Sequence, residues 1–199
     1  MIKEKLLQKL YCDQKLSMVE VADKISTTAR TIEYWLRKYN IPRRSRSESA
    51  YVKQNPNGDP FKIKRNLTQK EKGLLITGLI LYLGEGGKKF KHSIQLGNLD
   101  PRVIQIFVKF LRKICRINEN KLRLFVRLHR RFNKNKAQIY WSELLNLPSQ
   151  QVLVYRYNDP RSKDEKQWSK YGIAMIQFNN IKLKKWLDEK INRYLDRLE

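Results

Sequence analysis

One acidic side chain lies where its type and its neighbours could support chemistry. Glu85 follows Gly84 and precedes Gly86 and Gly87, at the end of the longest apolar run of the chain, residues 74–83. A carboxylate in this place is either a functional acid or an exposed glutamate held between glycines. Glu85 is therefore the first candidate for a catalytic residue.

The other residue types that usually carry chemistry are scarce. Cys12 and Cys115 are far apart and form no CxxC pair, so neither a disulfide framework nor a zinc site is indicated. His92 and His129 are the only histidines, which makes a His-rich metal site or a Ser-His-Asp triad a poor candidate. We expect a cytoplasmic, nucleoid-associated protein of a prokaryote or an organelle.

The charge of the chain indicates a polyanionic partner. The 199 residues include 43 Lys and Arg against 19 Asp and Glu, which gives a net charge of +24. Such a surplus favours nucleic acid, because cations release the counterions condensed on phosphates. A membrane surface would call for a basic amphipathic helix or a lipidation signal, and the amino terminus has neither an apolar signal-peptide region nor a myristoylation pattern. We expect double-stranded DNA as the partner and no membrane, with a merely solvated basic surface as the other interpretation.

Residues 1–42 predict a small all-α domain with a helix-turn-helix. A helix over residues 3–13 precedes a capping box formed by Ser17 and Glu20, and Thr28 can cap a helix over residues 29–39. The stretch 19–42 resembles the helix-turn-helix modules of resolvase-like proteins and transcription factors, in which the start of the second helix enters the major groove. A helical bundle that packs on the main domain is the alternative. The candidates for DNA contact are Thr28, Ala29, Arg30, Glu33 and Tyr34, with Arg30 first.

Residues 43–67 predict a basic linker between two domains. Pro, Asn, Gly and Ser end the helical periodicity there, and the segment includes Arg43, Arg44 and Arg46. Such a segment either follows the phosphate backbone or is a solvated connection.

Residues 68–199 predict an α+β domain that opens with an unusually apolar helix over residues 69–84. Apolar side chains surround its axis, so both faces need cover. One face can lie on the protein's own sheet, and a second copy of the same helix is the economical cover for the other. Gly78 and Gly84 would permit close approach of the two backbones. This predicts a homodimer.

The rest of this domain alternates strands and helices. We expect an antiparallel sheet with a basic face that holds DNA, because Arg123, Arg127 and His129 alternate with apolar residues along the strand 121–129. The other expected elements are strands over 91–98, 151–157 and 171–178, helices over 101–115, 135–145 and 181–198, and a loop over 159–170.

The stretch GLILYLGEGGKK resembles the motif of the LAGLIDADG homing endonucleases, and the order of elements is similar over residues 68–198. Members with one motif are homodimers whose paired helices bring carboxylates together, where divalent metal ions bind against the scissile phosphates. The resemblance implies a magnesium-dependent DNA endonuclease, with Glu85 as the catalytic and metal-binding acid and Gly84 as a helix-contact residue.

The chain also departs from this pattern. The acid is Glu where Asp is commoner, and residues 86–100 have room for one strand where the family usually has two. No motif matches the residues that tune the site, so Lys88, Lys89 and Gln95 are nearby candidates only, the two lysines as DNA contacts. A regulator that joins a similar domain to a helix-turn-helix and cuts nothing is the alternative function. A maturase-like role on RNA is a third.

Overall fold

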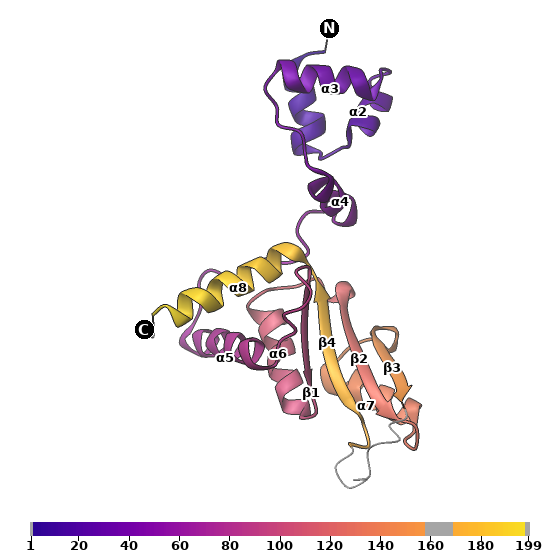
Figure 1. Ribbon diagram of the computed structural model, residues 1–199, viewed down its shortest axis with the longest axis vertical. Coiled ribbons are helices and arrows are strands. Elements are labelled where there is room, and N and C mark those ends of the chain that lie inside the picture. The colour runs from indigo at the N-terminus through magenta and orange to yellow at the C-terminus, as the bar shows by residue number, and fades with distance from the viewer. Residues whose placement is uncertain (1, 158–168, 198–199) are drawn as a thin grey trace. The chain divides into compact units, whose positions relative to one another are not determined.

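The computed structural model describes residues 2–157 and 169–197, which fold into two units, Met1–Asp59 and Pro60–Glu199 (Figure 1). Helices and a four-stranded sheet make the chain α+β, as predicted. The loop expected over 159–170 lies almost wholly outside the described residues. Within the described ranges, none of the helices combines the length and the hydropathy of a bilayer span.

The first unit is entirely helical. Its elements are α1 (Glu4–Leu7), which continues into the wider π-helical turn η1 (Gln8–Asp13), α2 (Met18–Lys24), α3 (Ala29–Lys38) and α4 (Arg46–Gln54). Leu7, Leu10, Val21, Ile32 and Leu36 form its core. Leu6 lies outside this core and is 41% exposed.

Local hydrogen bonds set the ends of α2 and α3. The Ser17 hydroxyl accepts from the backbone N–H of Glu20, while the Glu20 carboxylate accepts from that of Ser17, so the predicted capping box is present. The Thr28 hydroxyl accepts from the backbone N–H of Thr31. Ser26 has a φ of 53°, which turns the chain between the two helices.

The segment 43–67 differs from the linker that its composition predicts. It contains α4, which begins at a second capping box made by Ser45 and Glu48. Farther on, the N–H of Lys62 donates to the carbonyl of Cys115, and Phe61 and Ile63 pack against the core of the second unit. Capping therefore forms a helix within the first unit, and the apolar side chains attach the later part of the segment to the second unit.

The second unit surrounds one hydrophobic core. Its helices are α5 (Gln69–Glu85), α6 (Pro101–Lys113), α7 (Lys134–Leu145) and α8 (Ile181–Leu195). Its strands are β1 (Ser93–Asn98), β2 (Leu122–His129), β3 (Val152–Tyr157) and β4 (Ile173–Asn179), with short 3-10 turns η2 (Glu119–Lys121) and η3 (Ser149–Gln151) before β2 and β3. Figure 1 shows α5, α6 and α8 grouped beside β1.

The sheet is mixed, which corrects the prediction of an antiparallel sheet. The strand order is β1-β4-β2-β3; β4 runs antiparallel to both β1 and β2, but β3 runs parallel to β2. The reason is the connection through α7, which returns the chain to the starting end of β2 before β3 begins. The strand order places β3 at an edge of the sheet.

The two faces of the sheet differ sharply. One side chain in two along each strand enters the core, with Leu96, Leu124, Val154 and Ile176 among them. The alternate side chains point to the opposite face and are half-buried or exposed, apart from Ser93 and His129 at strand ends, which are buried. The helices therefore cover one face and leave the other open.

Candidate nucleic-acid interface

The start of α3 presents the predicted contact residues to solvent. Thr28, Arg30 and Tyr34 are exposed, while Ile32 and Leu36 on the other side of the helix are fully buried. Their burial against the rest of the unit fixes which side of α3 faces outward.

The three arginines that follow the helix-turn-helix have different environments. Arg43 forms an ion pair with Glu33 of α3, although its side chain stays 55% exposed. Arg46 is exposed in the first turn of α4. Both remain available as cations.

Arg44 is a structural residue, contrary to its prediction as a DNA contact. Its guanidinium donates to the carbonyl of Lys15 at 2.8 Å and to the carbonyl of Leu16, and it lies 4.2 Å from the ring centroid of Tyr11. The backbone N–H of Arg44 donates to the Tyr11 hydroxyl at 3.0 Å. Because Lys15 has a φ of 55°, Arg44 holds the turn that precedes α2 in a conformation that few side chains adopt.

Glu85 is the last residue of α5 and is exposed. The N–H of Gly86 donates to the carbonyl of Tyr82, and the N–H of Gly87 donates to the carbonyl of Gln95 on β1. A Cβ on Gly86 would lie 2.2 Å from the Tyr82 carbonyl oxygen, so only glycine fits there. Backbone contacts on both sides therefore fix the turn that carries Glu85.

Tyr82 supports this turn from inside. Its hydroxyl donates to the carbonyl of Gly87 at 3.1 Å, and its ring lies 5.4 Å from the ammonium of Lys184 on α8. Burial, with a smaller contribution from Asp188, raises the pKa of the Tyr82 phenol. The hydroxyl therefore stays protonated and keeps donating to the turn.

α5 has one covered and one open side. It packs on α6, α8 and β1 of its own chain, which bury Leu79 and Tyr82. On the open side Ile76 is 37% exposed and Ile80 is 51% exposed. We call the residues Gly73, Ile76, Thr77, Ile80 and Gly84 the α5 stripe; no described atom lies within 4 Å of a Cβ built on Gly73 or Gly84.

Gly78 is not part of this stripe, which corrects its prediction as a contact between two subunits. It is buried, and a Cβ there would lie 2.3 Å from Cγ of Phe110 on α6. Gly78 lets the Phe110 ring of the same chain approach the backbone of α5. Gly84, the other glycine predicted at the contact, lies on the open side of α5.

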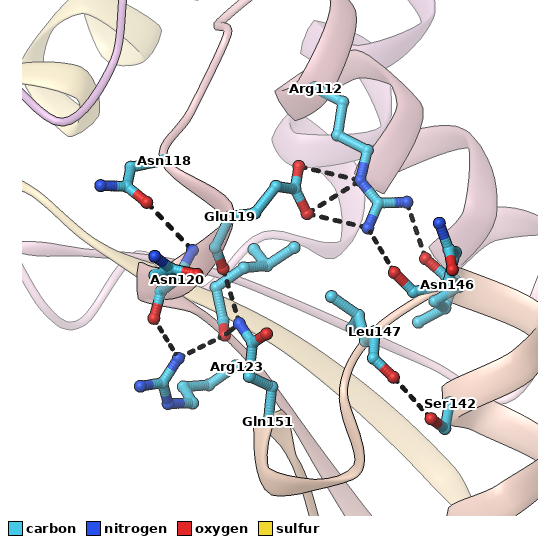
Figure 2. Close-up of polar contacts among 11 residues, drawn as sticks. Arg112, Asn118, Glu119, Asn120, Arg123, Ser142, Asn146, Leu147 and Gln151 are labelled. Atoms are coloured by element: carbon cyan, nitrogen blue, oxygen red, sulfur yellow. Dashed lines mark hydrogen bonds and ion pairs between the residues drawn. The ribbon is translucent and has the colours of Figure 1, made fainter.

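The residues predicted as DNA contacts on the basic strand β2 also differ in their exposure and hydrogen bonds. Arg127 is exposed on the open face. Arg123 also alternates onto that face, but its guanidinium donates to the carbonyls of Asn120 and Leu122 (Figure 2). His129 is only 9% exposed, and its Nδ1 accepts from the backbone N–H of Arg131, so it is a buried residue at the end of β2 and does not offer a free contact.

Lys88 and Lys89 are exposed in the turn after Glu85. The Lys89 ammonium lies 5.8 Å from the ring centroid of Phe90, which is 44% exposed. These lysines add positive charge next to the acid.

A divalent metal is implied by the resemblance only. Glu85 offers one carboxylate, a hard oxygen ligand of the kind that magnesium takes. In the described part of the chain, no three His, Cys, Asp or Glu side chains are grouped so that they could hold a metal ion. We therefore derive no chemical step through a metal ion.

Comparison of the chain with protein-family models, with curated proteins and with solved structures finds no match. The resemblance to the homing endonucleases therefore stays a prediction from the residues, and the function rests on the geometry.

Sequence reasoning missed two groups of residues at this interface. The first is the set of aromatic side chains on the open face of β3, Tyr155 and Tyr157, whose alternation with Val152 and Val154 could have revealed them. The second is Gln177 on β4, which accepts a hydrogen bond at 3.1 Å from Gln95 on β1, a residue that the sequence had offered only as a nearby candidate. No local signal predicts that pair, because 82 residues separate its members.

Proposed function

We propose that this chain is a sequence-specific DNA-binding protein that recognises duplex DNA through the start of α3. The observation that carries the proposal is the orientation of this helix, with Arg30 and Tyr34 outward and Ile32 and Leu36 fully buried. A helix placed in this way in a helix-turn-helix enters the major groove, where base edges are distinguishable. The net charge of +24 supports it through attraction to phosphates.

Two arginines at opposite ends of α3 give a matched test. Arg30→Ala removes a cation from the end that would meet the bases, and Arg37→Ala removes one from the last turn. A bidentate contact to guanine is worth about 1–3 kcal/mol, so Arg30→Ala is expected to weaken binding to a selected duplex about 5- to 150-fold while changing binding to random duplex little. Arg37→Ala is expected to weaken both equally. An equal loss on both duplexes for Arg30→Ala would contradict recognition by this end of the helix.

We further propose that the α5 stripe packs against the same stripe of a second copy. Two exposed isoleucines beside glycines and a threonine form a surface that another helix can approach closely. Light scattering after size exclusion is expected to give a dimer for the wild type and a monomer for Ile80→Asp, because the substitution would bury a charge at the contact. A wild-type monomer at high protein concentration would contradict the dimer.

A magnesium-dependent endonuclease is the second candidate, favoured by the place of Glu85 at the end of the α5 stripe. A twofold axis along the stripe would bring the two Glu85 carboxylates of a dimer to the same end of the contact. Divalent ions bound there would activate water and stabilise the leaving oxygen of a phosphodiester. Cleavage thus depends on formation of the dimer. If Glu85 binds no metal, the protein is a regulator that binds DNA without cutting it.

A further inference from the structure

The open face of the sheet carries a cluster of aromatic side chains. Phe125 lies on β2, and Tyr155 and Tyr157 lie on the neighbouring strand β3. They alternate along the strands with buried residues, and none of the three is among the side chains that form the hydrophobic core or pack against it. Tyr155 is 55% exposed. Phe125 and Tyr157 are half-buried. The three rings therefore lie outside the hydrophobic core and are partly or largely accessible to solvent.

The rings have a defined arrangement. The centroids of Phe125 and Tyr155 are 6.1 Å apart and the two ring planes differ by 18°, so the rings are nearly parallel. The guanidinium of Arg127 lies 5.0 Å from the centroid of the Tyr157 ring. The parallel register of β2 and β3, which places Arg127 opposite Tyr155, maintains this arrangement. The result is an ordered patch of ring faces with a cation beside it.

Amide groups border the patch on the same face. Gln95, Gln177 and Arg123 lie in one row across β1, β4 and β2, and Gln95 donates to Gln177 at 3.1 Å. Each amide offers both donors and acceptors, which can pair with the edges of nucleobases. The row next to it holds Met175 and Phe125 and gives an apolar floor.

Duplex DNA fits this face poorly. Bases in a duplex stack on one another and offer no ring face to a protein, so a sheet that binds a duplex uses cations on phosphates and polar side chains on base edges, and exposed rings add little. Here Arg123 donates to the backbone carbonyls of Asn120 and Leu122, and Arg127 lies against a tyrosine ring. A protein partner would match the apolar floor, but the net charge of +24 favours a polyanion. Unpaired nucleotides offer bases that can stack on the rings and phosphates that attract the positive charge.

We propose that the open face of the sheet binds unpaired nucleotides, whose bases stack on Phe125, Tyr155 and Tyr157. Stacking on aromatic side chains is sequence-tolerant, because every base has a π face. This site is separate from the helix-turn-helix and does not depend on duplex recognition by α3. The common chemistry is an unpaired base on a phosphate backbone, which single-stranded DNA and single-stranded RNA both supply.

Binding of the full chain to labelled oligonucleotides tests the proposal. Phe125→Leu and Tyr155→Leu remove a ring but keep an apolar side chain and the charge of the protein; Phe125→Tyr and Tyr155→Phe are the matched controls that keep the ring. Each Leu variant is expected to lower the affinity for ~12-nucleotide oligo(dT) or oligo(rU) about 5- to 150-fold, with an unchanged slope against salt concentration. The controls are expected to bind like the wild type, and the DNA and RNA arms identify the sugar that is preferred.

Two outcomes would overturn the proposal. If the Leu variants lose affinity for a duplex as much as for both single strands, the face holds duplex DNA. If they bind all oligonucleotides like the wild type, the face serves another partner, such as a protein. Thermal unfolding of each variant shows whether a loss of affinity comes from a loss of fold.

Photocrosslinking locates the bound bases without any substitution. Oligonucleotides that carry 5-iodouracil are expected to form adducts with peptides of β2 and β3 when irradiated in complex with the wild-type chain. Adducts confined to residues 2–59 would place single-strand binding on the first unit and would contradict the proposal.

Discussion

Replacement of Arg44 by Ala is expected to destabilise the first unit, whereas the same replacement at Arg46 is not. Both changes remove one positive charge, so their effect on general attraction to DNA is matched. Arg44→Ala removes two hydrogen bonds from a charged donor to the carbonyls of Lys15 and Leu16, and the contact with the Tyr11 ring. Hydrogen bonds of this kind contribute about 1.5–3 kcal/mol each and a cation-π contact about 0.5–2 kcal/mol. Because solvent reaches part of the site, we expect a total of about 2–4 kcal/mol.

Amide hydrogen exchange followed by mass spectrometry measures this effect within the first unit. A loss of about 2–4 kcal/mol corresponds to a fall of about 30- to 1,000-fold in the protection of α2 and α3. Peptides of the second unit serve as the internal reference, and Arg46→Ala is expected to leave the protection of both units unchanged. If Arg44→Ala weakens DNA binding with full protection of α2 and α3, its assignment as a structural residue is refuted.

Further predictions concern the second unit and the capping box. Gly78→Ala is expected to lower the free energy of unfolding by up to about 2 kcal/mol, because overpacking against Phe110 outweighs a gain in helix propensity of about 1 kcal/mol. Gly73 has no neighbouring atoms around its Cβ position, so Gly73→Ala is expected to raise the free energy of unfolding by about 1 kcal/mol in dilute protein. Denaturant unfolding measures both variants, and equal changes in the two would refute the assignment of Gly78 to the packed side of α5. The backbone N–H of Ser17 holds the pKa of Glu20 below its ordinary value of 4.5. The lowered pKa stabilises the folded state above pH 4.5, and this contribution is lost as the pH falls through the lowered pKa. Glu20→Gln is therefore expected to make the free energy of unfolding less dependent on pH in the acid range. Glu85→Gln is expected to abolish any magnesium-dependent cleavage of a bound site and to leave binding intact or tighter, as gel assays of nicking and of binding would report; undiminished cleavage would exclude Glu85 as the catalytic acid.

The helices other than α4 were predicted from sequence because their signals are local. The capping box of Ser17 with Glu20 fixes the start of α2, and a like box of Thr68 with Glu71 fixes the start of α5; in both the partner is only three positions away. The alternation along 122–129 likewise shows which side chains of β2 enter the core.

The sheet topology and the roles of single residues were less accessible, because they depend on contacts between distant segments. Alternation does not reveal the direction of β3, which depends on the route of the chain through α7. Nor does composition separate Arg44 from Arg46, since what distinguishes them is a pair of carbonyls 28 and 29 residues earlier in the chain. Gly78 and Gly84 look alike in sequence, and only the position of Phe110 divides them.

Selection of bound duplexes from a random pool tests the central claim most directly. With the full chain, sequence-specific recognition by α3 predicts the enrichment of a defined site, palindromic if the protein binds as a dimer. The same selection with Arg30→Ala is expected to lose the preference at one or two positions of that site and to keep the rest. Recovery of no enriched site with the wild-type chain, or of the same site with the variant, would contradict recognition of DNA by the start of α3.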